Sequence, residues 1–242
     1  MLTKNKIKII RSLANKKERY SQGRFVIEGE KIVNEALKMG IAIEELIVRE
    51  DLQDRIISSN YITASKKDLE RCSALKHSPG VLAICPFIKW DPPKIASGKY
   101  IMLDGVNDPG NLGTIIRIAD WFGIDGIICS KDTVDVYNQK VVQASMASVF
   151  RVPVWYYDLE EFIDSNSGCK FIAADLKGED LNSFTFPSNG ILIMGSESHG
   201  ISENLISRAD HKLTIPRVGD AESLNVSVAA GIICAKFSAQ AK

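Results

Sequence analysis

Polar residues gather where three apolar, strand-like runs of the chain end. The run at 100–104 leads into Asn-Asp-Pro-Gly-Asn-Leu-Gly, and the run at 191–194 leads into Gly-Ser-Glu-Ser-His-Gly. A third run, at 213–215, leads into a polar loop over 216–225. Short continuous apolar runs are typical of buried parallel strands. Because open parallel sheets bind ligands beyond the carboxyl ends of their strands, the three loops predict a binding site.

The first loop offers an amide and a guanidinium. Asn111 is predicted to cap a helix that begins at Leu112, since asparagine is a favoured N-cap. Arg117 follows inside that helix, with isoleucines on both sides. An arginine in apolar surroundings rarely lacks an anionic partner. Two interpretations are open, a structural salt bridge and an anion-binding role, and the residue alone favours the salt bridge.

The second and third loops combine small residues with hydrogen-bonding groups. Glycines at 195 and 200 flank Glu197, and they would let a ligand approach the backbone closely while the carboxylate accepts hydrogen bonds. In the third loop, Ser223 is predicted to cap a final helix that runs to about Gln240. Asn225 would then lie just inside that helix, where asparagine is unfavourable, so propensity does not explain it.

Other site chemistries lack their signatures. The first loop has no Gly-x-Gly-x-x-Gly, which argues against a nicotinamide-dependent oxidoreductase. The five cysteines are scattered and odd in number, and the three histidines are isolated, so neither a zinc site nor a disulfide framework is expected. No apolar run approaches a membrane span, and no signal peptide is recognised. We expect a reduced, cytoplasmic compartment and no metal.

Alternating strands and helices predict an α/β fold in two domains. From residue 99 we expect strands at 100–104, 126–129, 152–156, 171–174, 191–194 and 212–215, and helices at 112–122, 138–147, 159–165 and 202–208. This order predicts a parallel sheet with helices on both faces. A smaller α/β unit precedes it, beginning with a basic helix over 5–19. The Pro-Pro stretch at 90–98 is the most linker-like segment, which gives domains of 1–95 and 96–242.

The net charge of the whole chain is zero, but its distribution is uneven. Residues 1–31 contain nine lysines and arginines against three glutamates. Such a run indicates either a polyanion-binding patch or a solvated helix face.

The three loops resemble the three motifs of the SpoU/TrmH family of RNA ribose 2′-O-methyltransferases, in the SPOUT superfamily. Asn111, Gly113 and Arg117 match the first motif, and Gly195, Glu197 and Gly200 match the second. The third is matched by Ile215, Pro216, Gly219, Ser223, Leu224, Asn225, Val226 and Ser227. The amino-terminal unit is similar to the L30e-like substrate-binding domain of that family.

The resemblance implies a SPOUT parallel-sheet domain with a carboxy-terminal trefoil knot, a homodimer, and S-adenosyl-L-methionine as cofactor. It implies cofactor contacts at Met194, Gly195, Gly200, Ile215, Pro216, Gly219, Ser223, Leu224 and Asn225. It implies catalytic roles for Arg117, Asn111, Glu197, Ser223 and Asn225. RNA contacts are expected at Lys16, Lys17, Arg19 and Arg24.

The expected activity is therefore methyl transfer to a ribose 2′-hydroxyl, with ribosomal RNA favoured over transfer RNA by analogy. Two alternative functions are non-catalytic RNA binding and the nicotinamide-dependent oxidoreductase activity that the missing glycine motif disfavours. Intact polar residues in all three motifs argue against the first of these.

Overall fold

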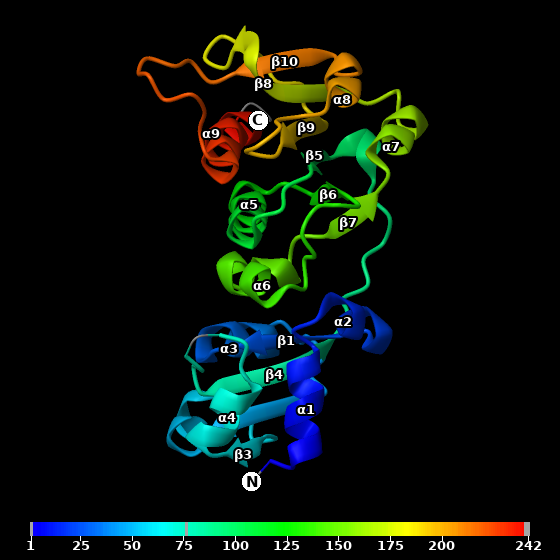
Figure 1. The fold of residues 1–242 in the computed structure, drawn as a ribbon. Helices are drawn as coiled ribbons and strands as arrows, with labels where there is room; N and C mark the ends of the chain where they lie inside the picture. The colour runs from blue at the N-terminus through cyan, green and yellow to red at the C-terminus, as the bar shows by residue number, and fades with distance from the viewer. Residues whose placement is uncertain (1, 76, 240–242) are drawn as a thin grey trace. The chain divides into compact units, whose positions relative to one another are not determined.

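The computed structural model describes residues 2–75 and 77–239, which fold into two compact units (Figure 1). The first unit comprises the chain up to Lys89 together with Asp135–Phe150, and the second comprises Trp90–Val134 and the chain from Arg151 onward. Residue 240, the expected end of the last helix, lies outside the described residues. Within the described part, no helix is both long enough and apolar enough to cross a membrane.

The first unit is built on a four-stranded sheet in the order β1-β4-β2-β3. Its strands are β1 (Arg24–Glu28), β2 (Glu45–Arg49), β3 (Ile62–Ala64) and β4 (Val81–Pro86), and β4 runs antiparallel to both of its neighbours. The accompanying helices are α1 (Lys4–Ser12), α2 (Lys16–Gln22), α3 (Glu30–Lys38) and α4 (Lys66–Cys72), with a 3₁₀ helix η1 (Glu50–Arg55). Helix α1 packs on α4, and apolar residues of both helices join those of the strands in one core.

The single amino-terminal helix predicted over 5–19 is two helices. Helix α1 ends at Ser12, and Asn15 begins α2 by accepting a hydrogen bond from the Lys17 backbone N–H at 2.8 Å. Asn15 has an extended backbone, as an N-cap requires, so the helix cannot pass through it.

Residues 135–150, which contain α6 (Gln139–Ser145), pack with the first unit rather than with the sheet that precedes them in sequence. Asp135 accepts hydrogen bonds from Arg19 Nε at 3.0 Å and Tyr20 Oη at 3.2 Å. The Tyr137 ring stacks on Phe87 with centroids 4.2 Å apart. A buried ion pair and an aromatic stack therefore hold this segment in the core of the first unit.

Glu28, at the end of β1, makes a second buried polar contact with the segment 135–150. Its side chain accepts hydrogen bonds from Ser73 Oγ at 2.6 Å and Gln139 Nε2 at 3.3 Å. Burial raises the pKa of the Glu28 carboxyl above that of an exposed glutamate.

The raised pKa makes stability depend on pH. Below the ordinary glutamate pKa the carboxyl is neutral in both states, whereas above it the unfolded chain ionises first and unfolding is favoured. We therefore expect the melting temperature of wild type, relative to Glu28→Gln, to fall as the pH rises from 4 towards neutrality. Thermal unfolding of both proteins across this range measures the difference, and a difference that does not change with pH would contradict the prediction.

The second unit is a six-stranded, wholly parallel sheet in the order β10-β8-β9-β5-β6-β7, which confirms the predicted parallel α/β domain. Its strands are β5 (Lys99–Asp104), β6 (Gly126–Ser130), β7 (Val154–Tyr157), β8 (Phe171–Asp180), β9 (Gly190–Gly195) and β10 (His211–Thr214). Strand β8 runs six residues beyond its predicted end at 174, because its far half pairs with β10 after a shift in register.

Helices cover both faces of this sheet (Figure 1). Helices α7 (Leu159–Ser165) and α8 (Glu203–Ser207) pack on one face through apolar residues such as Phe162 and Leu205. Helices α5 (Pro109–Phe122) and α9 (Val226–Ala239) contact each other and the sheet. The buried Lys99 Nζ donates a hydrogen bond to the Phe237 carbonyl at 2.5 Å, which fixes the last turn of α9 to the start of β5.

Candidate active site

The order of strands in the parallel sheet reverses between β5 and β9. Strands β6 and β7 lie beyond β5, whereas β8 and β10 lie beyond β9, and Asp104 at the end of β5 pairs in register with Gly195 at the end of β9. The chain leaves β5 for α5 and leaves β9 for α8. A reversal of this kind opens a crevice at the carboxyl edge, where ligands of open α/β sheets bind.

Helix α5 begins earlier than the sequence pattern predicts, and with a different cap. Asp108 is the N-cap and accepts a hydrogen bond from the Asn111 backbone N–H at 2.9 Å, with Pro109 in the first turn. The prediction of Asn111 as cap is therefore wrong. Asp108 takes the capping role, and the Asn111 side chain is left to make other contacts.

Asn111, Glu197 and Asn225, one from each of the three loops, are joined by hydrogen bonds. Asn111 Nδ2 donates to Glu197 Oε1 at 3.0 Å, and Asn225 Nδ2 donates to Asn111 Oδ1 at 2.9 Å. Asn225 Nδ2 also donates to Glu197 Oε1. We call these three residues the Asn–Glu–Asn triangle. It connects the starts of α5 and α9 with the loop after β9.

Asn225 lies before the last helix and not inside it. Helix α9 begins at Val226, and Asn225 Oδ1 accepts hydrogen bonds from the Ser227 backbone N–H at 3.0 Å and from Ser227 Oγ at 2.6 Å. The predicted cap at Ser223 is thus wrong, and the unfavourable interior position of Asn225 disappears. Because the capping contacts direct the amide oxygen of Asn225 towards Ser227, its amide nitrogen points towards Asn111 and Glu197.

Gly195 is required by the protein's own backbone. A Cβ atom at this position would lie 2.0 Å from the Gly200 carbonyl carbon and 2.2 Å from the Ile201 nitrogen. The loop closes on itself there, with Ser196 and Gly200 exchanging backbone hydrogen bonds of 3.1 and 2.9 Å. Close approach of the backbone was predicted at Gly195, but the partner seen in the structure is Gly200.

Arg117 lies on the exposed side of α5. Among the described residues, its guanidinium has no ion pair and no hydrogen bond within this chain. The interpretation as a structural salt bridge within one subunit therefore finds no support, and the cation is available to an anion outside the chain.

The third loop is open. Residues 216–225 are all exposed, and the Val218 side chain is fully so. No Cβ contact within 4 Å would arise at Gly219 or Gly200, so there is free space beside both. Met194 is buried at the end of β9, Ile215 is half-buried, and Ser223 and Leu224 are exposed. Ser223 makes no described hydrogen bond to the Asn–Glu–Asn triangle.

The four basic residues expected to bind RNA differ in their exposure to solvent and in their ion pairs. Lys16 and Lys17 are exposed at the start of α2, and Arg24 pairs with Glu44 at 2.8 Å. Arg19 is only 2 % exposed and is bound to Asp135, so a contact between Arg19 and RNA is contradicted. Its partner is 116 residues away in sequence, and charge patterning cannot reveal such a pair.

Asp104, which the motifs did not single out, pairs with Gly195 where β5 and β9 end. Its Oδ2 accepts a hydrogen bond from the Ser202 backbone N–H at 2.8 Å, which ties the end of β5 to the segment after the second loop. The sequence signal that could have identified Asp104 is an acidic residue at the end of a central strand of a parallel sheet.

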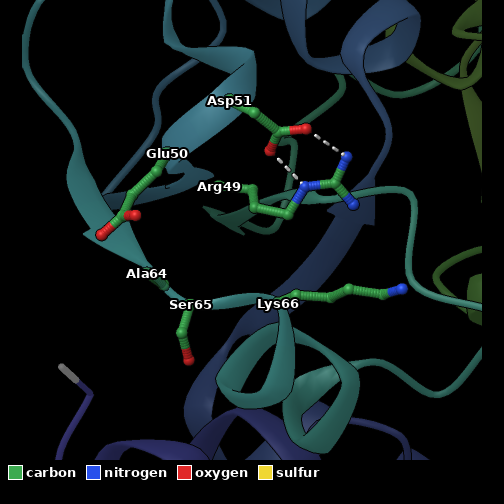
Figure 2. A pocket seen from close by; sticks show the side chains of 6 residues that line it. All are labelled: Arg49, Glu50, Asp51, Ala64, Ser65 and Lys66. Atoms are coloured by element: carbon green, nitrogen blue, oxygen red, sulfur yellow. Dashed lines mark hydrogen bonds and ion pairs between the residues drawn. The ribbon is translucent and has the colours of Figure 1, made fainter.

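Two pockets are lined by residues other than those of the Asn–Glu–Asn triangle. One, of about 420 Å³, is in the first unit, where Figure 2 shows Arg49 and Asp51 facing each other in an ion pair beside Ser65 and Lys66. The other, of about 220 Å³, lies at the ends of β5, β6 and β7 and has an acidic lining that includes Asp104 and Asp158. Neither contains a motif residue predicted for the site.

The cysteines are free thiols without a reactive environment. Burial raises the pKa of Cys234 to about 12 and that of Cys72 to about 11. A thiol with a raised pKa is rarely a thiolate at neutral pH, so these residues suit packing and not nucleophilic chemistry.

The second unit is a parallel α/β domain with a candidate ligand site at its switch point. Residues 98–235 match the model of the SpoU rRNA Methylase family, and residues 4–83 match that of an MRM3-like substrate binding domain. The chain therefore belongs to the SpoU rRNA methylase family, which confirms the resemblance drawn from the three motifs.

Several relatives match almost the whole chain. The 23S rRNA (guanosine(2553)-2'-O)-methyltransferase RlmP of Bacillus subtilis is 32% identical, with 94% of each chain covered. A solved structure of a putative TrmH-family RNA methyltransferase from Porphyromonas gingivalis has a TM-score of 0.88 at 32% identity, with 98% of each chain covered. An AdoMet-bound rRNA methyltransferase from Sinorhizobium meliloti has a TM-score of 0.84 at 32% identity, covering 98% of this chain and 95% of that one.

Proposed function

We propose that this protein transfers a methyl group from S-adenosylmethionine to a ribose 2′-hydroxyl of RNA, with ribosomal RNA as the substrate. The observation that carries the proposal is the Asn–Glu–Asn triangle, which brings the three family motifs together at the switch point of the sheet. The B. subtilis relative, named as an rRNA 2'-O-methyltransferase, supports the choice of reaction and of substrate.

The third loop suits the cofactor. A Cβ at Gly200 or Gly219 would meet no atom within 4 Å, so the backbone at both glycines is open to a ligand, and Leu224 in the third loop is 46% exposed and offers apolar surface. The residues that would hold it are Met194, Gly195, Gly200, Ile215, Pro216, Gly219, Ser223, Leu224 and Asn225. When bound, S-adenosylmethionine supplies a methyl group already activated on a sulfonium.

The hydroxyl oxygen takes the methyl group and releases its proton to solvent, which leaves a neutral thioether on the donor side. Because a ribose hydroxyl is a poor nucleophile with a pKa far above neutrality, the protein must hold it in line with the methyl group. Arg117 would hold the phosphate beside the target ribose in a two-pronged contact. Arginine keeps its proton in proteins, so its role is positioning and not base catalysis. Ser223 faces solvent and is available to the hydroxyl, while Glu197, Asn111 and Asn225 hold the loops at fixed distances.

An exposed apolar surface on α5 and α9 supports a homodimer. Trp121 is 82% exposed, and Val228 and Ile232 on α9 are exposed too. Helices α5 and α9 contact each other, so these side chains belong to neighbouring elements. Trp121 lies one helical turn from Arg117. We propose that a second copy of the chain covers Trp121 and that Arg117 acts in the site of that partner subunit.

Further parts of the proposal concern the domains. Residues 1–95 would supply an L30e-like domain that binds RNA, and residues 96–242 a SPOUT domain with a carboxy-terminal trefoil knot. The position of β9 between β5 and β8 supports this topology, as do the two family matches. The first compact unit ends at Lys89 and also takes in residues 135–150, so the boundaries of the compact units differ from these ranges. The free thiols are compatible with a cytoplasmic location.

Methyl transfer can be measured directly. Purified protein is incubated with labelled S-adenosylmethionine and with either ribosomal or transfer RNA from cells that lack the gene. We expect label in ribosomal RNA, at a nucleotide whose 3′ linkage becomes resistant to alkali. Label in transfer RNA alone would show that transfer RNA is the substrate, and label in neither RNA would overturn the proposal.

The two glycines of the cofactor loops are expected to respond differently to alanine. Gly195→Ala should lower the melting temperature of the cofactor-free protein, because its Cβ would overlap the Gly200 backbone. Gly219→Ala should leave that temperature unchanged, since its Cβ meets nothing, yet should weaken S-adenosylmethionine binding. Thermal unfolding and calorimetry measure the two effects. Unchanged affinity in Gly219→Ala would remove this glycine from the cofactor site.

A further inference from the structure

The basic residues at the amino terminus fall into two groups. Three are neutralised by partners within the first unit: Lys6 pairs with Glu45 at 2.6 Å, Arg24 pairs with Glu44, and Arg19 is buried on Asp135. The remaining basic residues of this region are exposed. Fewer basic residues are therefore available to a binding partner than the sequence suggests.

Lys4, Lys8 and Arg11 form a continuous stripe on α1, which we call the α1 stripe. At helical spacing they fall within an arc of about 60° and extend over roughly 10 Å, beside the face through which Ile7 and Ile10 enter the core. All three are exposed. Among the described residues, none of their side chains has an ion pair or a hydrogen bond.

Lys4 does not stabilise α1, whereas Arg11 lies in the last turn, where the helix dipole favours a cation. Lys4 lies in the first turn, where the helix dipole disfavours a cation, and that turn contains no acidic residue. Departures from local electrostatic preference are expected where a residue serves binding.

We propose that the α1 stripe binds the phosphate backbone of the RNA substrate, an inference that rests on the proposed function. A straight row of cations on a helix can follow successive phosphates, and counterion release would favour the contact. The stripe contains no aromatic side chain on which a base could stack, so it recognises charge and not sequence.

The test compares two triple variants in the full-length protein. Lys4→Gln/Lys8→Gln/Arg11→Gln removes the α1 stripe. The control, Lys31→Gln/Lys67→Gln/Lys140→Gln, removes the same charge from exposed positions of the same unit for which the structure describes no ion pair. RNA affinity is measured from 50 to 300 mM salt, and methyl transfer is measured at varied RNA concentration.

We expect the stripe variant to lose about 2 to 3 from the slope of log affinity against log salt, and on the order of tenfold in affinity near 150 mM. Its KM for RNA should rise while kcat and the melting temperature stay near the wild-type values. The control should keep the wild-type slope.

Two results would overturn the inference: an unchanged slope in the stripe variant, or an equal loss in both variants, which would reflect net charge alone. Both leave the proposed function standing if the wild-type protein transfers methyl groups. Absence of transfer by wild type would contradict the function independently of the slopes.

Discussion

Arg117→Ala is expected to lose most methyl transfer, by about a hundredfold or more, while S-adenosylmethionine binding is retained. The guanidinium is exposed and has no described partner within the chain, so its removal should cost the fold little. Misplacing the hydroxyl relative to the methyl group accounts for a rate loss of this size. Arg117→Lys should recover little, because an ammonium cannot make the planar two-pronged contact with phosphate.

Single-turnover rates and melting temperatures are measured on the same preparations. Lys177→Ala, which removes an exposed cation from the same unit, is the control and should behave as wild type. A stable Arg117→Ala protein with near-normal turnover would exclude this residue from the mechanism. Lost stability with normal activity per folded molecule would assign Arg117 a structural role, in contacts between subunits.

Asn225→Ser is expected to reduce methyl transfer by a similar factor while the fold is kept. Serine still caps α9 but cannot replace the amide nitrogen that joins Asn111 and Glu197. Asn225→Ala should lose the same activity and, in addition, about 1 kcal/mol of stability with the cap. A comparison of the two variants therefore separates the positioning role of Asn225 from its capping role.

The readouts are unfolding free energy and single-turnover rate, with Ser198→Ala as a control in the second loop, outside the triangle. Normal transfer by Asn225→Ser would show that the Asn–Glu–Asn triangle is not needed for the reaction. A loss of activity in Asn225→Ala but not in Asn225→Ser would mean that only the cap matters.

Mixing the two inactive variants tests the proposed dimer. If Arg117 acts in the partner's site, a heterodimer of Arg117→Ala and Asn225→Ser contains one intact site. Random mixing should then restore about a quarter of wild-type activity. If Arg117 acts in its own subunit, both sites remain defective and the mixture stays inactive.

Much of the second unit could be predicted from local pattern. The run at 100–104 is β5, the helix predicted at 159–165 is α7, and the three polar loops follow their strands as expected. Local sequence suffices here because a buried parallel strand needs a continuous apolar run, and the turn that ends it needs glycine, proline or a capping residue. The site residues could be named because they lie within a few positions of these turns.

Some local signals were present but were overlooked or assigned to the wrong residue. Asn15, with Glu18 three positions later, is the pattern of a helix start, and α2 begins there although one continuous helix over 5–19 was predicted. Asp108 before Pro109 is a stronger start signal than Asn111, because proline favours the first turn. At such places neighbouring residues compete for one cap, and propensity alone does not decide between them.

The sequence by itself determined the apolar strands, the polar loops after them and the residue types at the site. Tertiary structure decided which of these residues meet. Arg19 is buried because Asp135 lies against it, Gly195 must lack a side chain because Gly200 folds back on it, and Asn225 bridges two loops because α9 begins beside α5. Each of these contacts joins residues whose approach depends on packing elsewhere, and neither periodicity nor propensity contains that information.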